Sequence, residues 1–155
     1  MNSISIRAGA LEDAEEIFRI HKDSVVSLCA AEYKSEQIAM WLDGRSAETY
    51  VEAIVGGNLW LAQGRLIYGF VEIDGHEISK LFIRGSMAGQ GIGKQLLELA
   101  LEKICSAGYS TAYLEATLNA EKFYERFGFR KIGEGTFTRG NRPVPIEIVK
   151  MERLV

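Results

Sequence analysis

The sequence has few of the residues that disulfide-bonded and metal-binding proteins need. Among its 155 residues are 2 cysteines and 2 histidines. Cys29 and Cys105 belong to no paired motif, and His21 and His76 are too few to suggest a zinc site. We therefore expect no metal. Cys105 falls within an apolar helical pattern, so we expect it to be buried as a small hydrophobic residue.

Membrane and nucleic-acid signals are also missing. No apolar run approaches the roughly 18 residues that a membrane span requires. The first residues show neither a basic region nor an apolar segment typical of a secretory signal. No stripe of Lys and Arg with interleaved aromatics is present, which argues against a nucleic-acid partner. We expect a cytoplasmic protein that binds neither membranes nor nucleic acids.

The composition is that of an ordinary globular protein, with 47% hydrophobic and 25% charged residues. A chain of this length predicts a single domain over residues 1–155. The charge is uneven, because residues 1–77 hold 6 Lys and Arg against 13 Asp and Glu, whereas residues 78–155 hold 12 against 8. The acidic half is compatible with a cationic substrate or with a merely solvated acidic surface.

The most informative stretch runs from Leu81 to Leu97. Leu81, Phe82 and Ile83 are strand formers, and four glycines follow within nine residues. The apolar residues that come next recur at helical spacing until Gly108. The order is therefore a strand, a glycine-rich turn and a helix.

This order suits a phosphate group. The first N–H groups of a helix lack partners within the helix, and glycines let an anion approach the backbone. The alternative is a tight turn that only packs a helix on a sheet. Two known phosphate loops fit poorly: Gln95 stands where a nucleoside-triphosphate loop has a magnesium-binding hydroxyl, and neither glycine spacing completes a dinucleotide fingerprint.

The remaining pattern predicts alternating strands and helices. We expect strands at 4–7, 59–62, 66–73, 77–83, 111–117, 129–137 and 144–151, and helices at 12–28, 47–54 and 120–127, with a further helix capped by Ser35. Turns are expected at Asp74-Gly75 and at residues 139–143.

The glycine-rich turn resembles the acyl-CoA loop of the GNAT superfamily of N-acetyltransferases. Ala88-Gly89-Gln90-Gly91-Ile92-Gly93 is similar to the Arg/Gln-x-x-Gly-x-Gly/Ala pattern, although Ala88 replaces the usual Arg or Gln. A second stretch, from Asn119-Ala120 through Phe123-Tyr124 to Gly128-Phe129, resembles another signature of the family. The resemblance covers nearly the whole chain. It implies an α/β fold of the α+β type, with a mixed, mostly antiparallel sheet of about six or seven strands flanked by helices on both faces.

The resemblance also implies an activity: transfer of an acetyl group from acetyl-CoA to a primary amine of a small molecule or peptide, by direct attack in a ternary complex. It implies that the backbone around Ala88, Gly89, Gln90, Gly91, Ile92, Gly93 and Lys94 binds the coenzyme, and that Phe82 and Ile83 pair with its pantetheine arm. Asn119 either contacts the coenzyme or caps its own helix.

Two side chains are candidates for the chemistry. An amine with a pKa near 10.4 must lose a proton before it attacks, which costs about 4.6 kcal/mol at pH 7. By resemblance to the histone-acetylating branch, Glu77 is the candidate base, acting directly or through water. The alternative is that Glu77 is exposed and takes no part in the reaction. Glu72 and Glu115 are then the other candidate bases. Tyr124 is the candidate hydrogen-bond donor to the departing sulfur, unless it is simply a core aromatic.

The acceptor is poorly specified. The family fold would place Phe18, His21, Tyr33, Trp41, Phe137 and Arg139 near an acceptor pocket, but aromatics at helical spacing commonly belong to the core. A non-catalytic acyl-CoA sensor and a phosphate-binding nucleotide enzyme remain alternative functions. The identity of the amine, the acyl length and the oligomeric state stay open, with a homodimer as one option.

Overall fold

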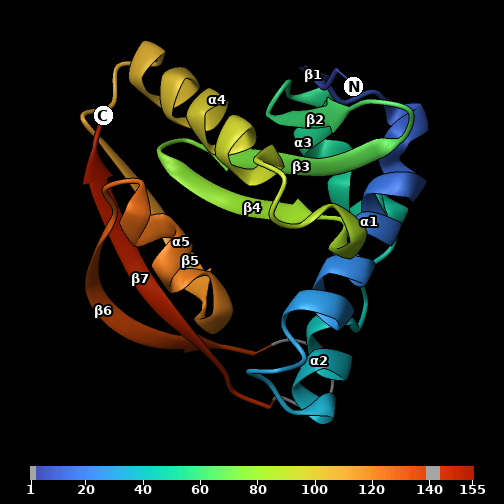
Figure 1. The fold of residues 1–155 in the computed structure, drawn as a ribbon, viewed down its shortest axis with the longest axis vertical. Helices are drawn as coiled ribbons and strands as arrows, with labels where there is room; N and C mark the ends of the chain where they lie inside the picture. Colours follow the sequence, from blue (N-terminus) through green and yellow to red (C-terminus); the bar gives the residue numbers. More distant parts are fainter. Residues whose placement is uncertain (1–2, 139–143) are drawn as a thin grey trace.

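The structure is a computed structural model that describes residues 3–138 and 144–155 (Figure 1). Its strands are β1 (Ser5–Ala8), β2 (Leu59–Gln63), β3 (Ile67–Asp74), β4 (Glu77–Ile83), β5 (Thr111–Thr117), β6 (Arg130–Phe137) and β7 (Ile146–Leu154). Its helices are α1 (Ala14–Leu28), α2 (Ser35–Leu42), α3 (Val51–Val55), α4 (Ile92–Ser106) and α5 (Glu121–Arg126). Short 3-10 turns lie at Leu11–Asp13, Ala47–Tyr50, Gly85–Met87 and Leu118–Ala120.

The described strands form one seven-stranded sheet in the order β1-β2-β3-β4-β5-β7-β6. Every neighbouring pair is antiparallel except β4 and β5, which are parallel. Helices α4 and α5 pack on one face, where they share a core with alternate residues of the sheet. Helices α1 and α3 bury the other face against β2 and β3. The predicted fold class, a mixed and mostly antiparallel sheet with helices on both faces, is confirmed.

The sheet opens between β4 and β5. The two strands pair at one position, Glu77 opposite Tyr113, and the amide of Tyr113 donates to the carbonyl of His76. Beyond that point the strands diverge toward their carboxyl ends, and Figure 1 shows α5 with β5, β6 and β7 turned away from β4. The edge of β4 from Ile78 to Ile83 therefore has no strand partner on this side among the described residues.

Local sequence explains why the elements meet here. Gly75, with φ of 62°, forms the tight turn that joins β3 to β4. Gly108 and Gly128 adopt φ of 96° and 87° where α4 and α5 end. Within α4, Leu96, Leu97, Ala100 and Ile104 are all fully buried, so this stripe fixes the helix on the sheet.

Several local predictions were wrong. Cys105 is exposed, because its neighbour Ile104 takes the inward position on α4. Lys34 rather than Ser35 is the N-cap of α2, and the Gln37 side chain accepts from the Lys34 amide at 2.8 Å. Of the two roles left open for Asn119, capping of α5 is not observed, because Asn119 lies within the preceding 3-10 turn and Ala120 takes the cap position.

Some predicted boundaries also shift. The third helix contains only Val51–Val55, after the 3-10 turn at Ala47–Tyr50. The last strand runs from Ile146 to Leu154, three residues further than its predicted end. The turn predicted at residues 139–143, which includes Arg139, lies outside the described residues.

Candidate active site

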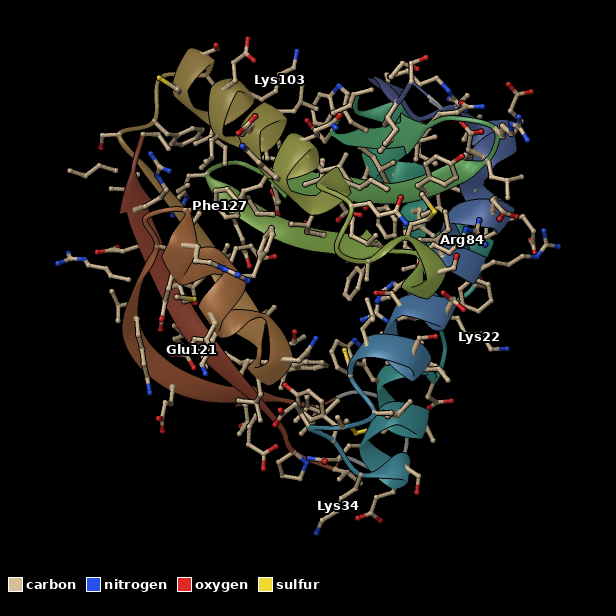
Figure 2. The ribbon with its side chains drawn as sticks, viewed as in Figure 1. Lys22, Lys34, Arg84, Lys103, Glu121 and Phe127 are labelled. Carbon is tan, nitrogen blue, oxygen red and sulfur yellow. The ribbon has the colours of Figure 1, made fainter. Side chains whose placement is uncertain are left out.

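A cleft of about 700 Å³ occupies the opening between β4 and β5. Its walls are β4, the loop before α4, the end of β5 and one face of α5, with the last turns of α1 at its side. Figure 2 places Phe127 at the end of α5 that approaches α4, and Glu121 at the opposite end. The lining residues are Ser24, Leu28, Cys29, Ile78–Ile83, Met87–Gly89, Gly91, Gly93, Lys94, Leu114–Thr117, Asn119, Ala120, Phe123, Tyr124, Arg126 and Phe127.

Most of the predicted coenzyme-binding residues line this cleft. Phe82 and Ile83 come from β4, whereas Asn119 and Tyr124 come from the segment after β5. From the loop, the lining includes Ala88, Gly89, Gly91, Gly93 and Lys94. Gln90 and Ile92 do not belong to the lining, and the Ile92 side chain is buried in the core beneath α4. A contact from Ile92 to a ligand would therefore have to come from its backbone.

The glycine-rich loop is shaped to leave its backbone accessible. Gly89 and Gly91 have φ of 78° and 81°, values that other residues rarely adopt. A Cβ atom built on either glycine would meet no protein atom within 4 Å, so both face open space. Gly91 is the N-cap of α4, whose first amides lack partners within the helix. The loop thus offers an anion both accessible amides and the positive end of a helix dipole.

Two contacts from α1 hold the start of this loop. The Gly85 amide donates to Asp23 Oδ2 at 2.7 Å, and Arg84 Nη2 donates to Glu16 Oε1 at 2.5 Å. The Arg84 guanidinium also donates to the Ile67 carbonyl, and it lowers the pKa of Glu16. Sequence analysis missed these contacts, because Asp23 and Gly85 are 62 residues apart. They fix the direction in which the chain leaves β4.

Tyr124 lies on the side of α5 that faces the cleft, with 7% of its surface exposed. Burial raises the pKa of its hydroxyl, so the phenol stays protonated. Within the described residues this hydroxyl has no hydrogen-bond partner, and it can therefore donate to a ligand. Nearby, burial raises the pKa of the Cys29 thiol to about 11, although the Asn119 side chain acts in the opposite direction. Cys29 is consequently an unreactive thiol near neutral pH.

The three candidate carboxylates occupy different positions. Glu77 begins β4 at the narrow end of the opening and does not belong to the lining of the cleft. Burial raises its pKa, and the charges of Glu115 and Asp74 add to the effect. Glu115 does line the cleft and accepts a hydrogen bond from the Tyr113 hydroxyl at 2.8 Å. Glu77 thus lies close enough to Glu115 to be influenced by its charge.

Glu72 is engaged elsewhere. One of its carboxylate oxygens accepts from Lys80 Nζ at 2.9 Å and from Ser79 Oγ at 3.0 Å, and its side chain is 12% exposed. The other oxygen is buried without a partner among the described residues. Because the Glu72 carboxylate is already held by Lys80 and Ser79, Glu77 and Glu115 are the better candidates.

The aromatic residues predicted near an acceptor pocket do not line the cleft. His21, which is 1% exposed, stacks on the Phe82 ring with centroids 4.0 Å apart, and its Nδ1 lies 2.7 Å from the Tyr50 hydroxyl. Trp41 contacts the rings of Tyr33, Phe82 and Phe137 edge-on, and Phe18 packs against the core between α1 and the sheet. These residues form a supporting layer behind Phe82, whereas Ser24 and Leu28 of α1 and Cys29 directly after it reach the cleft.

A second hollow, of about 860 Å³, lies near the carboxyl end of β5. The connection between α1 and α2 forms one wall, and β6 and β7 form the other. Leu118, which directly follows the cleft residue Thr117, belongs to its lining. Its charged lining residues are Glu32, Lys34, Glu36, Glu121, Lys131, Glu134 and Glu147, so carboxylates predominate.

Among residues 3–138 and 144–155, no group of three or more His, Cys, Asp or Glu side chains could hold a metal ion. In the same part of the chain, no helix has the length and apolar character needed to cross a membrane.

Comparisons with known proteins agree with this geometry. Residues 29–150 match the acetyltransferase (GNAT) domain family. The chain is 30% identical, over 92% of its length and 94% of the relative's, to the peptidyl-lysine N-acetyltransferase YjaB of Salmonella typhimurium. Among solved structures, a GCN5-related N-acetyltransferase from Rhodopseudomonas palustris superposes with a TM-score of 0.92 at 20% identity, covering 100% and 98% of the two chains. PaiA N-acetyltransferase from Thermoplasma acidophilum, in complex with coenzyme A, gives 0.79 at 22% identity, covering 99% of each.

Proposed function

Because the chain belongs to the GNAT family of acetyltransferases, we propose that it transfers an acetyl group from acetyl-CoA to a primary amine while both substrates are bound. The observation that carries this proposal is the cleft between β4 and β5, which ends at the accessible amides of the glycine-rich loop. An extended ligand with an anionic end fits a site that combines an unpaired strand edge with a helix N-terminus.

Each wall of the cleft has a separate task in this proposal. The amides around Gly91 hold the diphosphate, and the open edge of β4 at Phe82 and Ile83 pairs with the amides of the pantetheine arm. Acetyl-CoA supplies the acyl group as a thioester, which is activated toward attack by an amine. Binding both substrates in one cleft replaces a bimolecular encounter with a positioned reaction.

Glu77 is the proposed base. The acceptor nitrogen must lose a proton as its bond to the acyl carbon forms, and a carboxylate with a raised pKa accepts that proton more readily than an ordinary one. Since Glu77 lies at the narrow end of the opening rather than in its wall, we propose that it acts through water, with Glu115 as the neighbouring alternative. The C–S bond then breaks and the thiolate leaves.

Tyr124 is the proposed donor to that thiolate, and Tyr124→Phe tests the role. Loss of one hydrogen bond to a charged group costs about 1.5–3 kcal/mol, so kcat should fall roughly 10- to 100-fold. The KM for acetyl-CoA should change little, because the ring still fills its place in the core. Steady-state kinetics with a saturating amine would measure both constants.

A matched control is Tyr109→Phe, which removes a hydroxyl from an exposed tyrosine outside the cleft. It should leave both constants unchanged. An unaltered kcat in Tyr124→Phe would assign Tyr124 to the core and not to the reaction.

We propose that the acceptor is cationic, with a lysine side chain of a peptide as the leading candidate. The carboxylate-lined hollow next to Leu118 would favour a positively charged substrate approaching from that side. A relative that shares 30% identity is described as a peptidyl-lysine N-acetyltransferase, which supports the same choice.

The deciding experiment measures release of free thiol from acetyl-CoA with a panel of amines that includes lysine peptides, polyamines and neutral amino compounds. We expect turnover with the cationic members. Thermal unfolding with acetyl-CoA or ATP gives a parallel test of binding, since a ligand at 100 times its dissociation constant adds about 2.7 kcal/mol. Stabilisation without thiol release from any amine would favour the acyl-CoA sensor. Stabilisation by ATP alone would contradict the proposal.

A further inference from the structure

A third hollow, of about 740 Å³, lies where α5 ends beside the first residue of β5 and the last residues of β7. Its charged lining residues are Arg126, Arg130, Arg153 and Glu152. In a chain whose net charge is −3, a hollow with three arginines and one carboxylate is a concentrated positive surface.

Two of the three arginine charges are not neutralised. Arg130 Nη2 pairs with Glu152 Oε1 at 2.9 Å. Arg153 donates to two backbone carbonyls, from Nη1 to Phe127 at 2.6 Å and from Nε to Leu154 at 2.9 Å, and carbonyls leave its charge in place. Within the described residues, Arg126 makes no side-chain hydrogen bond or ion pair. The hollow therefore has both positive charge and unused N–H donors.

This hollow adjoins the cleft. Arg126 and Phe127 line both of them. One turn earlier on α5, Phe123 lies against the start of α4, since a Cβ built on Gly93 would be 3.2 Å from its ring. Residues three apart on a helix share a face and differ by about 4.5 Å along its axis. Arg126 thus lies one turn of α5 beyond the residue that contacts the start of α4.

Coenzyme A presents two separate anionic groups, the diphosphate and a phosphate monoester on the ribose of its adenosine. The loop at Gly89 and Gly91 can hold the first. The second, with a charge of about −1.5 to −2 at pH 7, would be stabilised by a cationic side chain beyond the loop. Arginine suits this task, because its planar guanidinium can donate two parallel hydrogen bonds to one phosphate.

We propose that Arg126, assisted by Arg153, binds the ribose 3′-phosphate of the coenzyme and so distinguishes coenzyme A from its dephosphorylated form. This inference rests on the proposed function, because it assumes that the diphosphate occupies the loop. It adds a binding site for a phosphate monoester at the junction of the cleft and the basic hollow.

Isothermal titration calorimetry with coenzyme A and with dephospho-coenzyme A tests the proposal without requiring turnover. The unmodified protein should bind coenzyme A at least about 10-fold more tightly, as expected for a hydrogen-bonded charge pair. Arg126→Gln should weaken coenzyme A binding by about that factor and leave dephospho-coenzyme A binding unchanged. Arg126→Lys should restore part of the difference, because it keeps the charge and loses the paired donors.

Lys22→Gln is the matched control, since Lys22 is an exposed cation on α1 that lines neither the cleft nor the hollow (Figure 2). It removes the same charge and should leave both affinities unchanged. Equal binding of the two coenzymes by the unmodified protein would overturn this inference and leave the proposed function intact. If Lys22→Gln and Arg126→Gln weakened coenzyme A binding equally, the inference would also be overturned, because the loss would then reflect net charge rather than a contact from Arg126. Failure to bind either coenzyme would instead overturn the proposed function.

Discussion

Replacing Gly91 with valine is expected to raise the dissociation constant for coenzyme A by about 100-fold, which corresponds to ~2.7 kcal/mol. The added side chain would project into open space at the N-cap of α4, where the diphosphate is proposed to lie, and would not collide with the protein. The backbone there has φ of 81°, so valine adds strain of about 1–2 kcal/mol, which the folded domain should tolerate. Calorimetric titration and thermal unfolding would measure the two effects separately.

Gly57 provides the control. It has φ of 73°, a Cβ built on it meets no atom within 4 Å, and it lies between α3 and β2, outside the cleft. Gly57→Val should therefore cause similar strain and leave coenzyme affinity unchanged. If the Gly91 variant bound coenzyme A as tightly as the unmodified protein, the loop could not be the diphosphate site.

Glu77→Gln should lower kcat by about 100-fold, the low end of what a positioned general base contributes. In the unmodified protein, kcat/KM should rise with pH as Glu77 loses its proton, at a pH above that of an ordinary carboxyl because its pKa is raised. The variant should lack this rise. Full turnover with an unchanged pH profile would remove Glu77 from the mechanism, and the same losses in Glu115→Gln alone would transfer the role to its neighbour.

The raised pKa also predicts an effect on stability that does not depend on catalysis. A carboxyl with a higher pKa in the folded state than in the unfolded state binds its proton more tightly when folded, so its ionisation lowers stability. This loss begins as the pH passes the unfolded value, near 4.3, and is complete above the raised folded value. Glu77→Gln should therefore unfold at a higher temperature than the unmodified protein at pH 7, with a smaller difference at pH 4.

Much of the fold could be predicted because its signals are local. The strand Thr111–Thr117 has its predicted bounds, since alternation of small and polar residues needs no partner to be recognised. The turn at Gly75 and the helix that follows Gly91 are likewise set by residues within a few positions. Cys105 shows the limit of such patterns, because a one-residue difference on a helix separates the buried face from the exposed one.

The site was only partly predictable, because it depends on distant pairs of residues. Two motifs identified the loop and Tyr124, but no local pattern shows that β4 and β5 pair only at Glu77 and Tyr113. Periodicity places Trp41 on an apolar face but does not show whether a ligand or another side chain covers it. In the structure, aromatic rings of the protein pack against Trp41. Arg126 carried no signal in the sequence, since its importance comes from two hollows that meet only in the folded chain.

The single bridge between β4 and β5 has a mechanical consequence. Within the seven-stranded sheet, one pair of residues joins strands β1 to β4 to strands β5 to β7, and α4 packs against both groups. An extended ligand that carries its own amides would pair with the open edge of β4 like an additional strand, and would connect the two groups of strands. The bound coenzyme would then stabilise the sheet, and its release after each turnover would remove this connection between β4 and β5.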